Sequence, residues 1–333
     1  MRIKIIPSLA FTLCFNLAGT AQATHPSAGI QGRQSGAIKT ISPATLQAGR
    51  WVAGLSFDYA ESDTISDSEL LALAERGISH VHSADSISTV SVNLAYGITD
   101  NFTLSVQLPY LNRDNVRENH LHAGEAEIER LGDSQGIGDL TVLGQYRFFS
   151  HDESLAALLL GIKLPTGSTH KINATGERFD TEFQPGSGSV DPLFGIAAKQ
   201  SWGPNSLTGS LLYTIATEGA QHTDLGDRFD YSLAYAYRIK GIVDNDESPD
   251  IGSGTAVDLV LELNGTWRDQ EKVDGEADPN SGVNVVYLSP GISVIGAQGW
   301  FGSLSAGIPV IKNVRGIQDD PGSRVFLSLG KSF

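Results

Sequence analysis

The fold is decided by residues 90–108, which read VSVNLAYGITDNFTLSVQL. Apolar side chains occupy every second position on both sides of a short polar turn, Thr99–Asn101. This alternation predicts two β-strands, because successive side chains of a strand point to opposite faces. The short turn between them predicts that the two strands form an antiparallel hairpin.

The same alternation recurs from Trp51 to the last residue, Phe333. We count twelve such segments of about 9–13 residues, near the length that a tilted membrane-spanning strand needs. One apolar residue from each segment, in chain order, is Leu55, Val92, Leu104, Val142, Leu160, Phe194, Leu211, Leu233, Leu261, Leu288, Leu304 and Leu327.

Charged side chains within these segments fall almost entirely on the face opposite the apolar one. A charge that faced lipid at mid-membrane would cost about 2–4 kcal/mol, so a lipid solvent demands this one-sided pattern. Lys331 is the exception, two residues from the end, where an interfacial position would tolerate it. The pattern predicts an all-β protein, a transmembrane antiparallel up-and-down β-barrel of about 12 strands.

A β-sandwich is the alternative, because it also buries one face of each strand. The segments are longer than ordinary strands, and aromatic residues lie near their ends, as in interfacial girdles. Tight turns such as Trp202–Asn205 alternate with longer polar connections. This favours a barrel with short periplasmic turns and long external loops. The predicted long connections are Glu61–Ser86, Leu111–Gly138, Pro165–Gly188, Arg268–Gly282 and Ile311–Arg324.

Two connections fit this plan less well. Glu218–Asp227 is only of moderate length for an external loop. Lys240–Thr255, which contains the acidic run Asp244–Glu247, is long for a periplasmic turn.

Composition excludes several classes of protein. The 333 residues carry a formal charge of −15, which excludes a basic nucleic-acid binder. The single cysteine, Cys14, excludes an intrachain disulfide scaffold. No apolar run long enough for a helical membrane span follows the first 23 residues.

The N-terminus predicts export from the cytoplasm. Arg2 and Lys4 precede the apolar stretch Ile5–Leu17, and Ala21-Gln22-Ala23 forms a small-x-small cleavage pattern. We therefore expect residues 1–23 to be a signal peptide, with export through the periplasm to the bacterial outer membrane. In residues 24–47 the apolar residues show neither helical nor strand spacing. We expect these residues to form a periplasmic or plug-like segment, or to be disordered. The barrel is expected to comprise residues 48–333.

Residues 66–77 of the first long connection carry leucines at helical spacing. This spacing predicts one short helix, which either covers the external loop or gates the pore.

Several stretches resemble a family of outer-membrane barrels labelled for the meta-pathway of phenol degradation and often called transporters. They are residues 96–102 (YGITDNF) with 108–110 (LPY), 136–140 (GIGDL) with 146–148 (YRF), 161–167 (GIKLPTG) and 186–192 (GSGSVDP). These are hairpin and strand-end patterns. The resemblance covers roughly residues 50–333. It implies a barrel that passes small hydrophobic or aromatic compounds, and it transfers no catalytic or ligand residue.

Charged residues on the inward face are the candidate lumen-lining residues. Basic and acidic side chains are mixed, so they either create a transverse field in an open channel or pair across a filled interior. The candidates are Asp139, Arg147, Lys163, Asp191, Lys199, Arg238, Asp258 and Glu262.

Two His-x-His pairs occur in the first two predicted external loops, His80 with His82 and His120 with His122. If these loops met, four imidazoles could bind a divalent metal. The spacing matches no recognised zinc pattern, so we expect solvated histidines and no metal site, with metal binding as the alternative. We also expect no cofactor and no enzyme activity, because no histidine is paired by spacing with a nucleophile.

These features predict a monomeric channel for passive diffusion of small hydrophobic or aromatic solutes. The alternative is a barrel without transport whose acidic external loops serve adhesion or structure. The expected partners are outer-membrane lipid, the small-molecule solute and the barrel-assembly machinery. The last of these would recognise the C-terminal strand that ends at Phe333.

Overall fold

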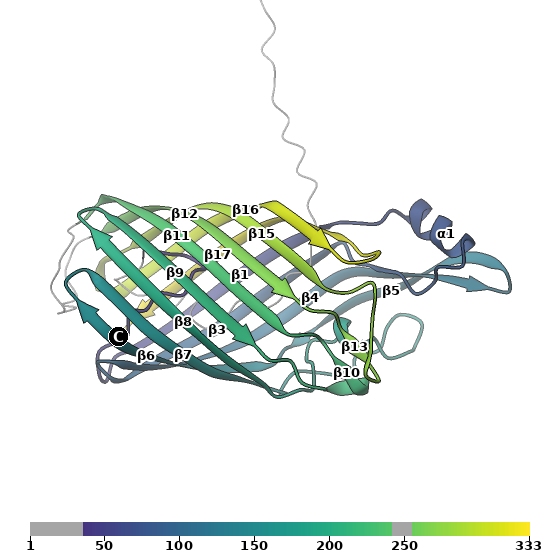
Figure 1. Ribbon diagram of the computed structural model, residues 1–333, viewed down its shortest axis with the longest axis horizontal. Coiled ribbons are helices and arrows are strands. Elements are labelled where there is room, and N and C mark those ends of the chain that lie inside the picture. The colour runs from purple at the N-terminus through teal and green to yellow at the C-terminus, as the bar shows by residue number, and fades with distance from the viewer. Residues whose placement is uncertain (1–35, 242–254) are drawn as a thin grey trace, which may run out of the picture.

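The computed structural model describes residues 36–241 and 255–333, which form a closed antiparallel β-barrel (Figure 1). The predicted signal peptide and the acidic run Asp244–Glu247 lie outside the described residues. Twelve barrel strands confirm the predicted number. They are β1 (Trp51–Asp63), β3 (Ser86–Thr99), β4 (Phe102–His122), β6 (Leu140–His151), β7 (Ser154–Leu164), β8 (Asp191–Trp202), β9 (Asn205–Thr214), β11 (Arg228–Lys240), β12 (Ala256–Arg268), β15 (Val283–Ile295), β16 (Trp300–Val314) and β17 (Asp320–Ser332).

Each barrel strand pairs antiparallel with its neighbours along the chain, and the last strand, β17, pairs with the first, β1. Trp51 and Phe333 extend this closure by exchanging backbone hydrogen bonds of 3.3 and 2.8 Å. Because every strand has two partners, the barrel has no open edge with unpaired backbone groups.

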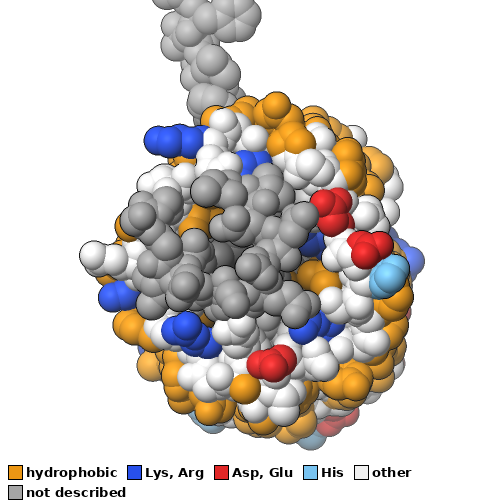
Figure 2. Space-filling model, turned by 90° about the vertical axis from the view of Figure 1, so that its left-hand side faces the viewer, with side chains coloured by type: hydrophobic (Ala, Val, Ile, Leu, Met, Phe, Trp, Pro, Cys, Tyr) orange, Lys and Arg blue, Asp and Glu red, His pale blue; other side chains and the backbone are white. Residues whose placement is uncertain are grey.

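The alternation of side chains matches the two sides of the wall. On β1, Leu55 is 54% exposed, whereas its neighbour Ser56 is 4% exposed and Asp58 is 2% exposed. Figure 2, a view of the barrel end that carries the short turns, shows hydrophobic side chains over most of the outer circumference. The outer surface is therefore apolar and the inner surface is rich in polar groups.

Among the described residues, no helix has the length and apolar character that a membrane span requires.

Lys331, the outward-facing exception, lies near the short-turn end of β17. Its Nζ atom lies 5.3 Å from the ring centroid of Trp300 and 5.0 Å from that of Phe333. Cation–π contacts with a belt of aromatic rings suit the membrane interface, where an ammonium group reaches water.

The opposite end of the barrel, which we call the long-loop end, corrects two predicted connections. Residues 111–138, expected as a loop, continue β4 and return as β5 (Glu125–Ile137), a hairpin that projects beyond the barrel (Figure 1). This strand pair is not embedded in the wall. Its sequence is therefore polar and lacks the alternation of apolar residues from which the other strands were predicted. Arg324, placed at the end of the last long loop, lies instead within β17.

The predicted helix is confirmed as α1 (Asp67–Glu75). Ser66 caps its N-terminus by accepting a hydrogen bond from the backbone N–H of Glu69, as expected of a serine three residues before a glutamate. Its buried residues, among them Leu70 and Leu73, pack on Val81 and so fix α1 beside the β4–β5 hairpin.

Short elements complete the loops among the described residues. They are β2 (His82–Ser83), β10 (Thr223–Asp224), β13 (Lys272–Val273), β14 (Glu276–Ala277), and the 3-10 turns η1 (Thr181–Phe183), η2 (Ala220–His222) and η3 (Ala297–Gly299).

Candidate functional site

Residues 36–47, which we call the lumen segment, lie inside the barrel and cross it. The carboxylate of Glu262 on β12 accepts hydrogen bonds from the backbone N–H groups of residues 38, 39 and 40, at 2.8 to 3.2 Å. The N–H of Ile41 donates to Ser210 Oγ on β9 at 3.2 Å. The N–H of Leu46 donates to Thr103 Oγ1 on β4 at 2.8 Å. Side chains from three separate strands therefore hold one segment across the interior.

Two isoleucines of the lumen segment are buried against the wall. Ile41 contacts a cluster that includes Leu143, Leu159 and Leu212. Ile38 contacts a second cluster that includes Phe326. At these two places the lumen segment covers apolar side chains of the inner wall.

A three-membered charge cluster lies beside the lumen segment. Lys39 Nζ is 2.8 Å from Asp58 Oδ2, and Arg324 binds both oxygens of the same carboxylate at 2.6 and 2.8 Å. One carboxylate thus joins two cations, and the forked Arg324 contact is the strong, geometrically specific kind. The cluster ties the lumen segment to the β1–β17 closure of the wall.

Aromatic rings accompany these cations and help to line a cavity next to the lumen segment. Lys39 Nζ lies 5.3 Å from the ring centroid of Phe326, and Arg324 Cζ lies 5.7 Å from that of Tyr287. The cavity residues are Lys39, Asn264, Tyr287, Ser289, Ser305, Gly307, Arg324 and Phe326. The cavity has room for about one water molecule, so in this conformation it is too small for an aromatic molecule, although its lining combines π faces, cations and hydroxyl groups.

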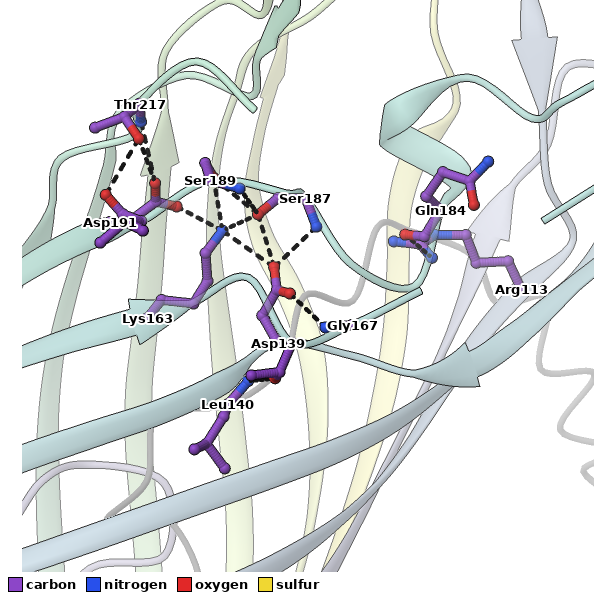
Figure 3. A network of polar contacts seen from close by, with 12 residues as sticks. Arg113, Asp139, Leu140, Lys163, Gly167, Gln184, Ser187, Ser189, Asp191 and Thr217 are labelled. Carbon is purple, nitrogen blue, oxygen red and sulfur yellow. Dashed lines mark hydrogen bonds and ion pairs between the residues drawn. The ribbon is translucent and has the colours of Figure 1, made fainter. Parts of the chain in front are cut away.

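A second polar network lies nearer the long-loop end (Figure 3). Lys163 extends between two carboxylates, with Nζ 2.5 Å from Asp191 Oδ2 and 3.6 Å from Asp139 Oδ2. Asp139 accepts from the backbone N–H groups of Gly167 and Ser187 at 2.9 and 2.8 Å. Through Asp139, the wall fixes both ends of residues 165–190, which we call the inward loop.

The inward loop also has apolar and polar anchors along its length. Phe179 is 1% exposed and packs with Phe183, Val116 and Leu131. Arg113 donates from Nη1 to the backbone oxygens of Phe183 and of residue 184, at 3.3 and 3.2 Å. The inward loop therefore forms a fixed part of the long-loop end.

The other candidate lumen residues occupy inward positions at different depths. Arg238 forms a two-point ion pair with Asp258, at 2.5 and 2.8 Å. Lys199 is half-buried on β8. Arg147 lies near the short-turn end and donates to the side chain of Asn101 at 2.9 Å. The candidates therefore form local pairs and networks at several levels of the wall.

Sequence reasoning did not single out several residues of these networks, among them Arg324, Phe326 and Lys39. Arg324 and Phe326 alternate with the outward residues of β17, so their inward position could have been read from the pattern. Lys39 gave no such signal, because apolar residues do not recur at a regular spacing in the lumen segment. The carboxylates that the segment contacts also lie far away in the sequence.

The structure brings three of the four loop histidines together at the long-loop end. His80 Nδ1 is 2.6 Å from Glu118 Oε1, and His120 Nε2 is 3.1 Å from Glu118 Oε2. His82 Nδ1 is 3.2 Å from Glu182 Oε1. His122 is exposed at the end of β4 and is not part of this group.

The acidic neighbours control the charge of His82. Burial alone would lower the pKa of His82, but hydrogen bonds and charge attraction from Glu118 and Glu182 outweigh it and raise the pKa to about 10. His82 is therefore a cation at neutral pH.

Solved structures show what this barrel is similar to. An outer membrane channel from Pseudomonas putida F1 has a TM-score of 0.56 and 15% sequence identity, over 87% of this chain and 97% of that chain. A deltaS2S3 mutant of the TodX monoaromatic hydrocarbon channel has a TM-score of 0.46 and 10% identity, over 87% of this chain and 92% of that chain. The first likeness supports the fold. No curated protein matches the sequence.

A family model described as "Putative MetA-pathway of phenol degradation" matches residues 78–316. This range contains every barrel strand except β1 and β17, together with the histidine group and the inward loop. It also contains all the stretches, from Tyr96 to Pro192, that carried the resemblance in the sequence, and the resemblance is confirmed. The chain belongs to this family.

Proposed function

We propose that the protein is an outer-membrane channel for passive passage of small hydrophobic or aromatic compounds. A closed barrel with an apolar outer surface suits a lipid environment, because every backbone polar group of a membrane strand must be paired. The family is described by its relation to phenol degradation, and both structural neighbours are described as channels. We expect the barrel to move its solute without chemical change.

The single observation that carries the proposal is the occupant of the lumen. Small barrels fill their interiors with side chains of the wall itself. In this barrel a separate stretch of chain fills the interior, and polar contacts to Glu262, Asp58 and Ser210 hold much of it. Such contacts can be exchanged for contacts with water, so the lumen segment can act as a removable plug.

In this proposal the solute follows the mixed-charge inner wall once the lumen segment has moved. Lys39 helps to close the small cavity between Tyr287, Phe326 and Arg324, so we expect an aromatic solute to bind there only after the lumen segment has left. The proposed lining residues remain Asp139, Arg147, Lys163, Asp191, Lys199, Arg238, Asp258 and Glu262.

Biogenesis follows from the same proposal. The first 23 residues would direct export through the periplasm. The assembly machinery would receive the strand that ends at Phe333, which completes the barrel by pairing with β1.

One observation favours the alternative, a surface barrel without transport. The lumen segment and the inward loop both narrow the interior, and many of their residues are fully buried. If the lumen segment never leaves the interior, no solute can pass, and the barrel would serve only to hold its external loops at the cell surface for adhesion or structure.

Channel recordings distinguish the two functions. We would insert the wild-type protein and a variant lacking residues 36–47 into planar bilayers. The proposal expects the deletion to raise conductance several-fold, because it empties the lumen. It also expects phenol, but not glucose at equal concentration, to reduce the ion current by occupying the lumen. If the folded deletion variant conducts no ions, the surface-barrel function is correct.

A further inference from the structure

A group of imidazoles and carboxylates lies at the long-loop end, outside the lumen. His80 precedes β2, while Glu118 and His120 lie on the part of β4 that projects beyond the barrel. One possible ligand atom from each of these three residues lies within 4.8 Å of the other two. The proposed transport path uses none of them.

The distances between these atoms are close to those of a metal coordination shell. A tetrahedral ion with bonds of about 2.0–2.2 Å places neighbouring ligand atoms roughly 3.3–3.6 Å apart. His80 Nδ1 lies 2.6 Å from one oxygen of Glu118, and His120 Nε2 lies 3.1 Å from the other. To surround one ion, His80 Nδ1 would exchange its hydrogen bond to Glu118 for the ion, and the three ligand atoms, now within 4.8 Å of one another, would move to a common spacing.

A fourth ligand is available on the neighbouring strand. Glu129 on β5 stands directly opposite Glu118 in the β4–β5 register, and its Oε2 lies 3.0 Å from His120 Nε2. Two like charges directly opposite each other in a sheet are destabilising unless a cation lies between them. His80, Glu118, His120 and Glu129 together provide two nitrogen and two carboxylate ligands.

The nitrogen of His120 lacks another role among the described residues. His120 Nε2 is buried and makes no hydrogen bond there, although oxygens of Glu118 and Glu129 are close to it. Neither oxygen has the alignment that a ring N–H requires. An imidazole nitrogen that points between two carboxylates without donating to either is suited to bind an ion instead.

The chain around the group is held rigidly. The fully buried Asn119 accepts from the N–H of Val81 at 2.8 Å and donates to the backbone oxygens of Leu70 and Ile78, at 2.8 and 2.9 Å. These bonds fix α1 and the segment before β2 against β4. The His80 side chain is itself exposed, so an ion can reach the group from solvent.

We propose that His80, Glu118 and His120, with Glu129 as the fourth ligand, bind a divalent transition metal ion of the zinc type. Imidazole and carboxylate ligands in this number suit zinc and its first-row neighbours. The bound ion would link the segment before β2 to both strands of the projecting hairpin. His82 lies beside the group, with Nε2 3.5 Å from Glu118 Oε2 and Nδ1 3.2 Å from Glu182 Oε1.

Isothermal titration of zinc chloride into the folded, untagged protein in detergent tests the proposal after removal of metals with a chelator. The expected result is one zinc ion per chain. His80→Ala and His120→Ala are each expected to weaken binding at least tenfold, because loss of a mere supporting group already costs about 10–100-fold. His122→Ala is the matched control, since His122 is exposed on the same strand beyond the group.

Hydrogen exchange adds a readout that does not depend on affinity. Zinc should slow exchange of the backbone amides in residues 78–83 and 117–130 of the wild type, but not in His120→Ala. Folding of each variant is checked by thermal unfolding of the barrel without metal. Absence of zinc binding to the folded wild type, or equal loss of binding in His122→Ala and His120→Ala, would overturn the proposal.

Discussion

The lumen segment and the inward loop both narrow the same barrel, but they are held differently. The lumen segment leads into β1 at one end, and a single side chain, Glu262, accepts three of its backbone N–H groups. The inward loop is joined to barrel strands at both ends and is fixed by Asp139, Arg113 and the buried Phe179.

Because their anchors differ, we expect the lumen segment to move more easily than the inward loop. Moving the inward loop would expose a phenylalanine cluster and break several independent anchors, so its local unfolding is costly. Moving the lumen segment breaks contacts with Glu262, Ser210 and Asp58 that water can partly replace. It also uncovers Ile38, Ile41 and their apolar neighbours on the wall, which a hydrophobic or aromatic solute could cover in their place. Under the proposed function, we therefore expect the lumen segment to act as the gate and the inward loop to set the shape of the interior.

The largest effect is expected from Glu262→Ala. Three buried N–H groups would lose a charged acceptor, which destabilises docking of the lumen segment by roughly 3 kcal/mol or more. That free energy corresponds to about a hundredfold shift toward the undocked state. Recordings in planar bilayers should show a large rise in open probability, and the amides of residues 38–40 should exchange faster with deuterium.

Asp258→Ala is the matched control for this prediction. Asp258 lies on β12 in the same inward row as Glu262, but it pairs with Arg238 and makes no described hydrogen bond to the lumen segment. The open probability of the Asp258→Ala variant should remain near that of the wild type. Equal opening of both variants would mean that general damage to β12 opens the barrel, and the comparison would fail.

A smaller effect is expected from Asp139→Asn. The substitution replaces one acceptor oxygen of the carboxylate that holds Gly167 and Ser187, which costs about 1–3 kcal/mol locally. Phe179 and Arg113 still anchor the inward loop, so amide exchange at its two ends should rise while conductance changes little.

Asp191→Asn serves as the control, because Asp191 pairs with Lys163 and with Thr217 but makes no described bond to the backbone of the inward loop. Ejection of the inward loop in Asp139→Asn, seen as proteolytic cleavage within residues 165–190, would show that both constrictions are movable.

The barrel wall was predictable because lipid imposes a simple rule on each strand. Alternation placed Leu55 outward and Asp58 inward without knowledge of any partner strand. The hairpin of β4 and β5 escaped prediction because it projects from the wall, so no apolar face marks it. Arg324 escaped because polar residues at the start of β17 resembled a loop.

The candidate site was only partly predictable. The alternating pattern indicated Glu262 and Asp258, but not that Glu262 would hold a segment more than two hundred residues away in the chain. The two histidine pairs indicated a possible cluster. Only the fold selected His80, His82 and His120 over His122, and only the fold showed that the nearby Glu118 lies against all three.

The most direct test of the account is a reversible lock on the lumen segment. Ile41→Cys and Ser210→Cys would be combined with Glu262→Ala, because the Ile41 N–H lies 3.2 Å from Ser210 Oγ. The native Cys14 lies in the predicted signal peptide, so no other thiol should compete. The account predicts high conductance with the pair reduced and low conductance once it is oxidised. Equal conductance in the two states, with the disulfide verified, would contradict it.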